Sequence, residues 1–251
     1  YANKVANVNI VSDSSSNNFT NVADPEKWNI SDDPDYFFYC ANETVHGLEL
    51  HNPIESDSPV ICDMSSTIAS RPIDINKYDL VFAGAQKNLG IAGLTILIIK
   101  NNLLSDCNKE LLPMFDYSAH AEEASMLNTS PVFSWYVSGL IFDWITEQGG
   151  IGMMGKVNME KSSLLYNYID ESSFYSNPVS KPYRSWMNIP FILARDDLEN
   201  DFIQNAEDEG LFNLKGHRTV GGMRASVYNA MPIEGIKRLI SFMDEFAKLH
   251  E

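Results

Sequence analysis

Two side chains able to do chemistry follow apolar runs of the chain. Asp63 ends the run 60–63, and Lys87 follows the run 79–83, 24 positions after Asp63. Ligands of α/β proteins bind beside the carboxyl ends of strands. Pyridoxal phosphate (PLP) needs such a pair, because a lysine forms its Schiff base and a carboxylate keeps its ring nitrogen protonated. The pair indicates PLP chemistry, with an exposed loop lysine and a turn-capping aspartate as the alternatives.

A second set of candidates is basic and lies near the end of the chain. Residues 211–224 contain Lys215, His217, Arg218 and Arg224 and no acid, in a chain whose formal net charge is −16. A basic stretch in an acidic protein favours an anion site. The planar guanidinium of arginine is suited to a carboxylate. Ordinary surface charge is the alternative for these residues.

The composition excludes several classes of protein. With 44% hydrophobic and 21% charged residues in 251, the chain is neither disordered nor fibrous. Its 34 acidic against 18 basic residues argue against nucleic acid or an anionic membrane surface as partner. No apolar run approaches the roughly 18–20 residues of a membrane span. Cys40, Cys62 and Cys107 lack metal-ligand spacing, so we expect reduced thiols, an intracellular location and no metal site.

The elements that must position these residues begin with four apolar runs typical of strands, at 36–40, 59–64, 79–83 and 94–99. Because the runs are continuous rather than alternating, they predict strands of an α/β sheet buried on both faces. The polar, acidic residues 1–35 allow one short strand within 5–11.

Helical patterns dominate the rest of the chain. An apolar stripe over 132–145 predicts a helix with Ser130 as N-cap and Pro131 at its first position, ended by Gly149 and Gly150. We place a domain boundary at residue 150. The remaining residues predict a smaller α+β unit with helices at 154–169, 197–209 and 233–246 and strands at 187–193 and 222–228.

Four segments carry a resemblance to a known family: 39–47 (YCANETVHG), 63–66 (DMSS), 83–90 (AGAQKNLG) and 216–226 (GHRTVGGMRAS). In order along the whole chain, they resemble the phosphoserine aminotransferases, with wording closest to eukaryotic members. The resemblance implies the fold of type I PLP-dependent transferases, with a mixed, mostly parallel sheet. It implies a large PLP-binding domain at 1–150, whose N-terminal part we expect to be missing, and a small α+β domain at 151–251.

The resemblance also implies an activity. These enzymes of serine biosynthesis are cytoplasmic homodimers with active sites at the interface. They interconvert 3-phosphohydroxypyruvate and L-glutamate with O-phospho-L-serine and 2-oxoglutarate by ping-pong transamination. A related PLP aminotransferase, a desulfurase and an inactive binding protein are the alternatives. We expect a glycine-rich phosphate segment, a ring-stacking tryptophan and a His-Arg pair for the substrate in a segment before Tyr1.

Residue by residue, the resemblance assigns the cofactor contacts to five positions. Lys87 matches the Schiff-base lysine that also moves the proton, and Asp63 matches the partner of the pyridine nitrogen. Thr44 matches a contact to the ring region, and Gln86 matches a cofactor-binding glutamine. Asn128 and Thr129 match a pair that reaches the cofactor phosphate of the neighbouring subunit. Placement before a helix start suits an anion, and simple helix capping is the alternative.

The substrate contacts implied by the resemblance fall in the basic stretch. Arg224 matches the arginine that binds the α-carboxylate. His217 and Arg218 match residues near the distal anionic group. The sequence departs from the family pattern at Ser130, where a proline is usual, and at Ile91, where a smaller residue or a proline is frequent.

Overall fold

The computed structural model describes residues 2–105 and 111–250, so Cys107 lies outside the described residues. Two compact units form. Unit 1 comprises Tyr1–Pro34, Asn42–His51 and Lys156–Glu251, and unit 2 comprises Asp35–Ala41 and Asn52–Gly155. The predicted division of the chain into domains at residue 150 stays a prediction. In the part of the chain that the structure describes, no helix has the length and apolar character needed to cross a bilayer.

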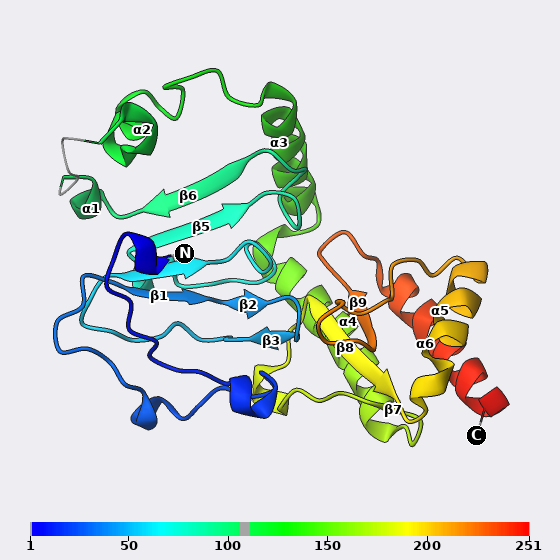
Figure 1. Cartoon of the computed structure of the whole chain (residues 1–251). Helices are drawn as coiled ribbons and strands as arrows, with labels where there is room; N and C mark the ends of the chain where they lie inside the picture. The colour runs from blue at the N-terminus through cyan, green and yellow to red at the C-terminus, as the bar shows by residue number, and fades with distance from the viewer. Residues whose placement is uncertain (1, 106–110, 251) are drawn as a thin grey trace. The chain divides into compact units, whose positions relative to one another are not determined.

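Unit 2 contains a four-stranded sheet in the order β1-β4-β5-β6 (Figure 1). Its strands are β1 (Phe37–Cys40), β4 (Val60–Asp63), β5 (Leu80–Gly84) and β6 (Thr95–Ile99). The first three strands are parallel, and β6 is antiparallel to β5. All four predicted strands are present, in a mixed and mostly parallel sheet.

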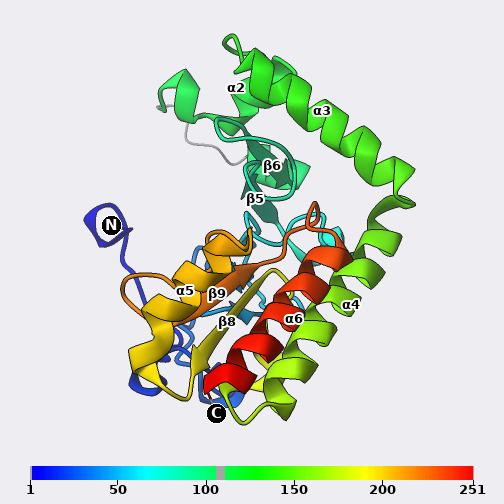
Figure 2. The ribbon, with the colours of Figure 1, turned by 90° about the vertical axis from the view of Figure 1, so that its right-hand side faces the viewer.

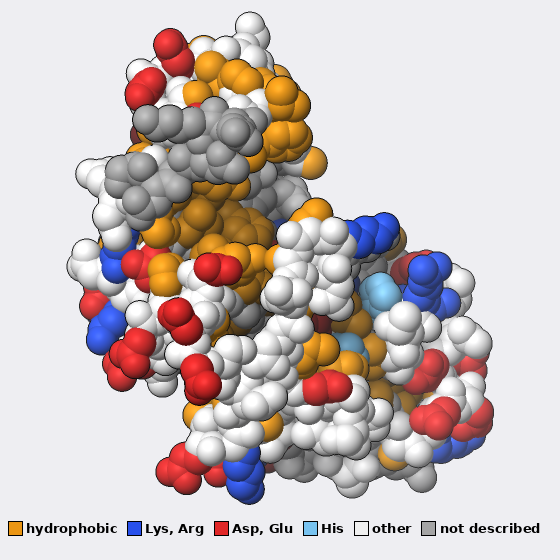
Figure 3. All heavy atoms as spheres, turned by 60° about the vertical axis from the view of Figure 1, so that its left-hand side comes forward, with side chains coloured by type: hydrophobic (Ala, Val, Ile, Leu, Met, Phe, Trp, Pro, Cys, Tyr) orange, Lys and Arg blue, Asp and Glu red, His pale blue; other side chains and the backbone are white. Residues whose placement is uncertain are grey.

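Burial of this sheet differs from the prediction. Phe37 and Tyr39 are buried, whereas Phe38, between them, is 54% exposed. The Phe38 ring instead stacks on Phe82 of β5, with centroids 6.3 Å apart, and hydrophobic side chains also gather at the surface seen in Figure 3. The prediction of strands buried on both faces is therefore wrong. A continuous apolar run does not distinguish a strand covered twice from one whose second face stays partly open.

The helices of unit 2 are α1 (Asn101–Ser105), α2 (Tyr117–Glu122) and α3 (Val132–Glu147). The predicted start of α3 is wrong by one residue. Pro131, at φ −68° and ψ 83°, occupies the N-cap and supplies no side-chain hydrogen bond. Ser130 lies outside the helix, with its hydroxyl 3.8 Å from the sulfur of Met126. The predicted end is confirmed, because Gly149 follows the helix at φ +95°.

Helix α4 (Gly150–Glu171) begins earlier than predicted and carries the chain from unit 2 into unit 1. Unit 1 contains the hairpin β2 (Asn42–Glu43) and β3 (Leu48–Glu49), which the sequence did not predict. Its antiparallel sheet has the order β7-β8-β9, and α5 and α6 complete the unit. These elements are β7 (Tyr175–Ser176), β8 (Asn188–Leu193), β9 (Met223–Ser226), α5 (Glu199–Asp208) and α6 (Ile233–His250).

Short 3-10 turns make up the other helical elements: Ala2–Lys4, Ser15–Asn17, Pro25–Lys27, Ile75–Lys77, Pro113–Phe115, Lys181–Tyr183 and Asp196–Leu198. The strand allowed within residues 5–11 does not form. Val5 and Ile10 are exposed there, so they contribute no apolar burial to stabilise a strand.

An aromatic cluster forms the core of unit 1. Phe202 of α5 meets Phe242 and Phe246 of α6 edge to face, each with centroids 5.1 Å apart. Phe191 of β8 packs on the same ring. Figure 2 shows α4, α5 and α6 around β8 and β9. Such edge-to-face pairs each add about 0.5–1.5 kcal/mol to the burial of apolar area, so this cluster fixes the helices on the sheet.

Lys161 of α4 is fully buried in unit 1. Its ammonium group donates to the backbone carbonyls of Val227, Tyr228 and Met231 at 3.1, 2.9 and 2.9 Å. Burial disfavours the charged form and lowers the pKa of Lys161 from 10.5 to about 8. The lysine therefore joins α4 to the segment after β9.

The stability of unit 1 should depend on pH through Lys161. Between pH 8 and 10.5, the unfolded chain keeps a proton on this amine that the folded chain has lost, so the free energy of unfolding rises with pH. Lys161→Met removes this contribution. We expect the melting temperature of the unmodified protein to rise relative to that of Lys161→Met between pH 8 and 10. Parallel melting curves against pH would show the assignment to be wrong.

Candidate active site

Asp63 and Lys87 lie at the same edge of the sheet in unit 2. β4 and β5 are parallel neighbours, with Asp63 opposite Phe82. The carboxylate Oδ1 of Asp63 accepts the N–H of Ser65 at 2.8 Å. Its Oδ2 has no hydrogen-bond partner among the residues that the structure describes. One carboxylate oxygen is thus fixed and the other is open to a ligand.

The turn after β5 carries Gln86 and Lys87. The N–H of Gly84 donates to the Ser65 hydroxyl at 3.0 Å, which ties this turn to the end of β4. The Gln86 amide lies over Gly84, where a Cβ would come within 2.5 Å of its Oε1. Lys87 is half-buried, between the buried Ala85 and the buried Leu89. Local packing therefore holds the lysine beside the edge where Asp63 ends β4.

Gly90 closes the same turn and requires glycine. Its φ is +155°, and a Cβ there would lie 2.6 Å from the hydroxyl of Ser138 on α3. The close approach of α3 to this backbone explains the glycine. Packing of α3 against this turn therefore limits how far Lys87 can move.

Asn128 and Thr129 precede α3 and are both exposed. The Asn128 side-chain amide donates to the Thr129 carbonyl at 3.1 Å. Neither residue caps α3, because Pro131 occupies the N-cap. Their predicted contact with a cofactor phosphate in the neighbouring subunit stays a prediction.

Thr44 and Arg224 of unit 1 meet across 180 positions of the sequence. Nη1 of Arg224 on β9 donates to the Thr44 carbonyl at 2.9 Å. The Nε atom of Arg224 is buried and has no hydrogen-bond partner in the described structure. The guanidinium is thus held by one backbone carbonyl and keeps other N–H groups for an anion.

The remaining basic residues form a compact loop before β9. The N–H of Gly216 donates to the Gly222 carbonyl at 2.8 Å. The His217 carbonyl accepts from the N–H groups of Val220 and Gly221, and its ring Nδ1 lies 2.8 Å from the Thr219 hydroxyl. Arg218 between them is exposed. His217 and Arg218 are therefore presented by an ordered loop.

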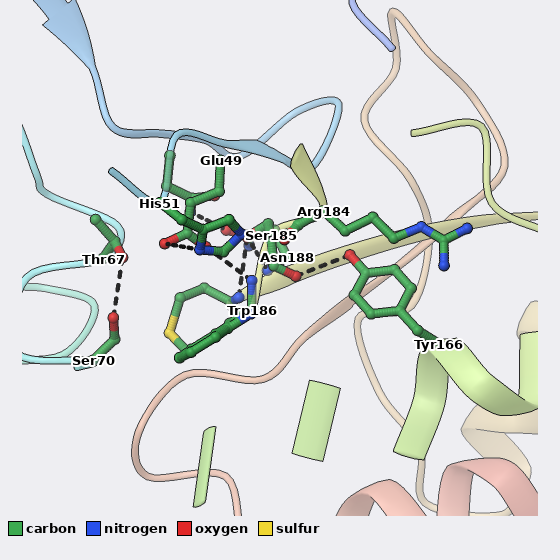
Figure 4. A network of polar contacts seen from close by, with 11 residues as sticks. Glu49, His51, Thr67, Ser70, Tyr166, Arg184, Ser185, Trp186 and Asn188 are labelled. Carbon is green, nitrogen blue, oxygen red and sulfur yellow. Dashed lines mark hydrogen bonds and ion pairs between the residues drawn. The ribbon is translucent and has the colours of Figure 1, made fainter. Parts of the chain in front are cut away.

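A buried polar network of unit 1 escaped the sequence analysis (Figure 4). The fully buried Glu49 accepts the N–H of Trp186 at 2.9 Å, and the Tyr166 hydroxyl donates to the Ser185 carbonyl at 2.9 Å. The Ser185 hydroxyl accepts from the N–H of Asn188. These bonds fix the hairpin that carries Thr44. Acids and amides beside short strands were the available signal, but their partners lie far away in the sequence.

The predicted site residues divide between the two units. Thr44, His217, Arg218 and Arg224 belong to unit 1, and Asp63, Gln86, Lys87, Asn128 and Thr129 belong to unit 2. Across residues 2–105 and 111–250, no group of three or more His, Cys, Asp or Glu residues is arranged to hold a metal ion.

Known proteins resemble this chain along nearly its whole length. The family model "Aminotransferase class-V" matches residues 2–239. A phosphoserine aminotransferase of Acinetobacter baumannii (strain ACICU) is 50% identical over 227 residues, covering 90% of this chain and 63% of the relative. The solved phosphoserine aminotransferase of Bacillus circulans subsp. alkalophilus is 38% identical with a TM-score of 0.96, covering 100% of this chain and 70% of that one.

A further solved structure is a PLP-bound phosphoserine aminotransferase from Trichomonas vaginalis. It is 37% identical with a TM-score of 0.85, over 90% of this chain and 64% of that one. The chain spans 63% of the length of the Acinetobacter relative. The fold is that of these PLP-dependent aminotransferases, as the resemblance implied. From the family match over residues 2–239, the chain belongs to the class-V aminotransferases.

Proposed function

We propose that the protein is a phosphoserine aminotransferase. It interconverts 3-phosphohydroxypyruvate and L-glutamate with O-phospho-L-serine and 2-oxoglutarate in serine biosynthesis. The observation that carries this proposal is the placement of Asp63 and Lys87 at the carboxyl edge of one parallel strand pair. Identity of 50% to a relative with this name supports the choice of substrate.

The residues of unit 2 fit PLP as cofactor. The fit lies in the donor set, a carboxylate with one open oxygen on Asp63 and a primary amine on Lys87. Bound PLP supplies an electron sink for the carbanion at the substrate Cα. Lys87 holds the cofactor and moves the Cα proton, while Asp63 binds the ring nitrogen and Gln86 contacts the cofactor. Thr44 contacts the ring region.

The residues of unit 1 provide the anion contacts of the substrate. Arg224 binds the α-carboxylate through the N–H groups that Thr44 does not use. His217 and Arg218 bind the distal anion, which is a phosphate in phosphoserine and a carboxylate in glutamate. This set favours a dianionic amino acid over alanine.

The direct test uses the PLP-loaded protein. Adding L-glutamate should change the visible absorbance of the cofactor and release 2-oxoglutarate, and phosphoserine should turn over far faster than alanine. An unchanged spectrum with glutamate would reject transamination. Faster turnover of alanine would identify a related aminotransferase with another substrate.

The proposed assembly is a homodimer in which Asn128 and Thr129 reach the neighbouring active site. Support comes from α3, where Phe133 and Tyr136 are 70% and 61% exposed. Apolar exposure of this kind is frequent at surfaces that bind another protein. Phe133→Asp should shift the sedimentation coefficient towards that of a monomer, whereas Glu147→Gln on the same helix should not. A monomeric unmodified protein would contradict the assembly.

Location and other partners remain expectations from the sequence. A cytoplasmic location is proposed from the reduced cysteines, of which the structure describes Cys40 and Cys62 as free thiols. The absence of nucleic-acid and membrane partners is proposed from the net charge of −16.

A further inference from the structure

The turn between β2 and β3 presents the carbonyl that binds Arg224, and Glu43 shapes this turn. The turn comprises residues 44–47. Glu43 Oε1 accepts the N–H of Val45 at 3.0 Å, and Oε2 accepts the N–H of His46 at 2.8 Å. The His46 ring Nδ1 also lies 2.9 Å from Oε2. Although burial opposes ionisation, these bonds leave the pKa of Glu43 below its ordinary value, so the carboxylate is charged at neutral pH.

The rest of the hairpin is fastened to β8 and the residues before it. The Asn42 amide donates to Asn188 Oδ1 at 3.0 Å, and the N–H of Ser185 donates to the Gly47 carbonyl at 3.0 Å. Gly47 has φ +72°, and a Cβ there would come within 2.3 Å of Pro190 Cδ. Both ends of the turn are thus immobilised, so its internal geometry depends on Glu43.

Arg224 is fixed to the same strand from the other side. In the β8–β9 ladder, Arg224 stands opposite Pro190. Because the Arg224 backbone and the hairpin share β8 as support, the direction of the Thr44 carbonyl sets where the guanidinium lies. The buried Nε atom of Arg224 has no hydrogen-bond partner among the described residues, which leaves this carbonyl as its assigned side-chain anchor.

We propose that Glu43 is a positioning residue for the substrate: its carboxylate shapes the 44–47 turn so that the Thr44 carbonyl aims Arg224 at the substrate carboxylate. This inference rests on the proposed function. It gives Glu43 no contact with the substrate or with the reacting atoms. Loss of its carboxylate should therefore weaken carboxylate binding and leave the chemical step unchanged.

The first measurement compares Glu43→Gln with the unmodified PLP-loaded protein. The glutamine amide nitrogen cannot accept a hydrogen bond, so either the Val45 or the His46 bonds are lost. We expect KM for phosphoserine and for glutamate to rise about tenfold, with kcat within about twofold and the cofactor spectrum unchanged. Glu207→Gln, at an exposed position of α5, is the matched control and should leave both constants unchanged.

A double-mutant cycle with Arg224→Lys tests whether Glu43 acts through Arg224. Lysine lacks the fork that binds the Thr44 carbonyl and the substrate together, so Glu43→Gln should add less than about a twofold rise in KM to Arg224→Lys. A tenfold rise in both backgrounds, or an unchanged KM in Glu43→Gln, would overturn the inference.

Stability is controlled by recording melting temperatures for every variant. If Glu43→Gln does not fold, Glu43→Asp replaces it in the same cycle, because the shorter carboxylate cannot reach both N–H groups. The same non-additivity is then expected, and additivity would again reject the inference. Absence of turnover by the unmodified protein rejects the proposed function itself before any variant is compared.

Discussion

Lys87→Ala is expected to abolish transamination in a protein that still folds. The substitution removes the amine beside the Asp63 edge of the sheet, and with it both the cofactor bond and the group that moves the proton. Proton transfer by a positioned side chain is worth about 10²–10⁴-fold in rate, so we expect kcat to fall by at least about 10³-fold. Single-turnover measurements with glutamate provide the rate, and thermal melting provides the stability.

The control for Lys87→Ala is Lys77→Ala in the same unit. Lys77 is half-exposed and forms an ion pair with Glu55 at 3.3 Å, and such surface pairs contribute little to stability. It should retain full activity. A small primary amine added to Lys87→Ala should restore part of the rate. Retention of a tenth of the original kcat by Lys87→Ala would refute the assigned role.

Asp63→Asn has the second largest expected effect. Asparagine keeps the size of the side chain and an oxygen that can accept from the N–H of Ser65. It loses the negative charge that keeps a ring nitrogen protonated, so the cofactor becomes a weaker electron sink. Loss of a hydrogen bond between charged groups costs about 1.5–3 kcal/mol, which corresponds to a fall in kcat of about 10- to 150-fold.

Separating charge from structure is the purpose of the control for Asp63→Asn. Asp57→Asn makes the same change at an exposed position of unit 2 and should have no effect on kcat. The melting temperature of Asp63→Asn should stay close to that of the unmodified protein. An unchanged kcat would show that Asp63 serves only to shape the turn at Ser65.

The elements predicted correctly from sequence are those whose own residues determine them. β4, β5, α3 and α6 have long apolar patterns, which give local signals of strand and helix. The hairpin of β2 and β3 consists of two-residue strands without such a pattern. Its stability comes from partners such as Asn188, 146 positions from Asn42. Contacts at such separations cannot be inferred from local propensity.

The candidate site divides in the same way. Asp63 and Lys87 were predictable because each follows a strand, and the carboxyl ends of parallel strands share an edge. The contact between Arg224 and the Thr44 carbonyl was not predictable, since a backbone acceptor leaves no trace in residue types. Glu43 was missed for the same reason, because its bonds are mainly to backbone N–H groups.

The interleaving of the two units along the chain has a consequence for synthesis on the ribosome. Unit 2 is complete once Gly155 has emerged, whereas Tyr1–Pro34 belongs with Lys156–Glu251. At about 5–20 residues per second, those last residues take roughly 5–20 s to be made. During that interval the earliest part of unit 1 has no core to join. We therefore expect unit 2 to fold first, and nascent chains halted near residue 155 to leave residues 1–34 open to proteases.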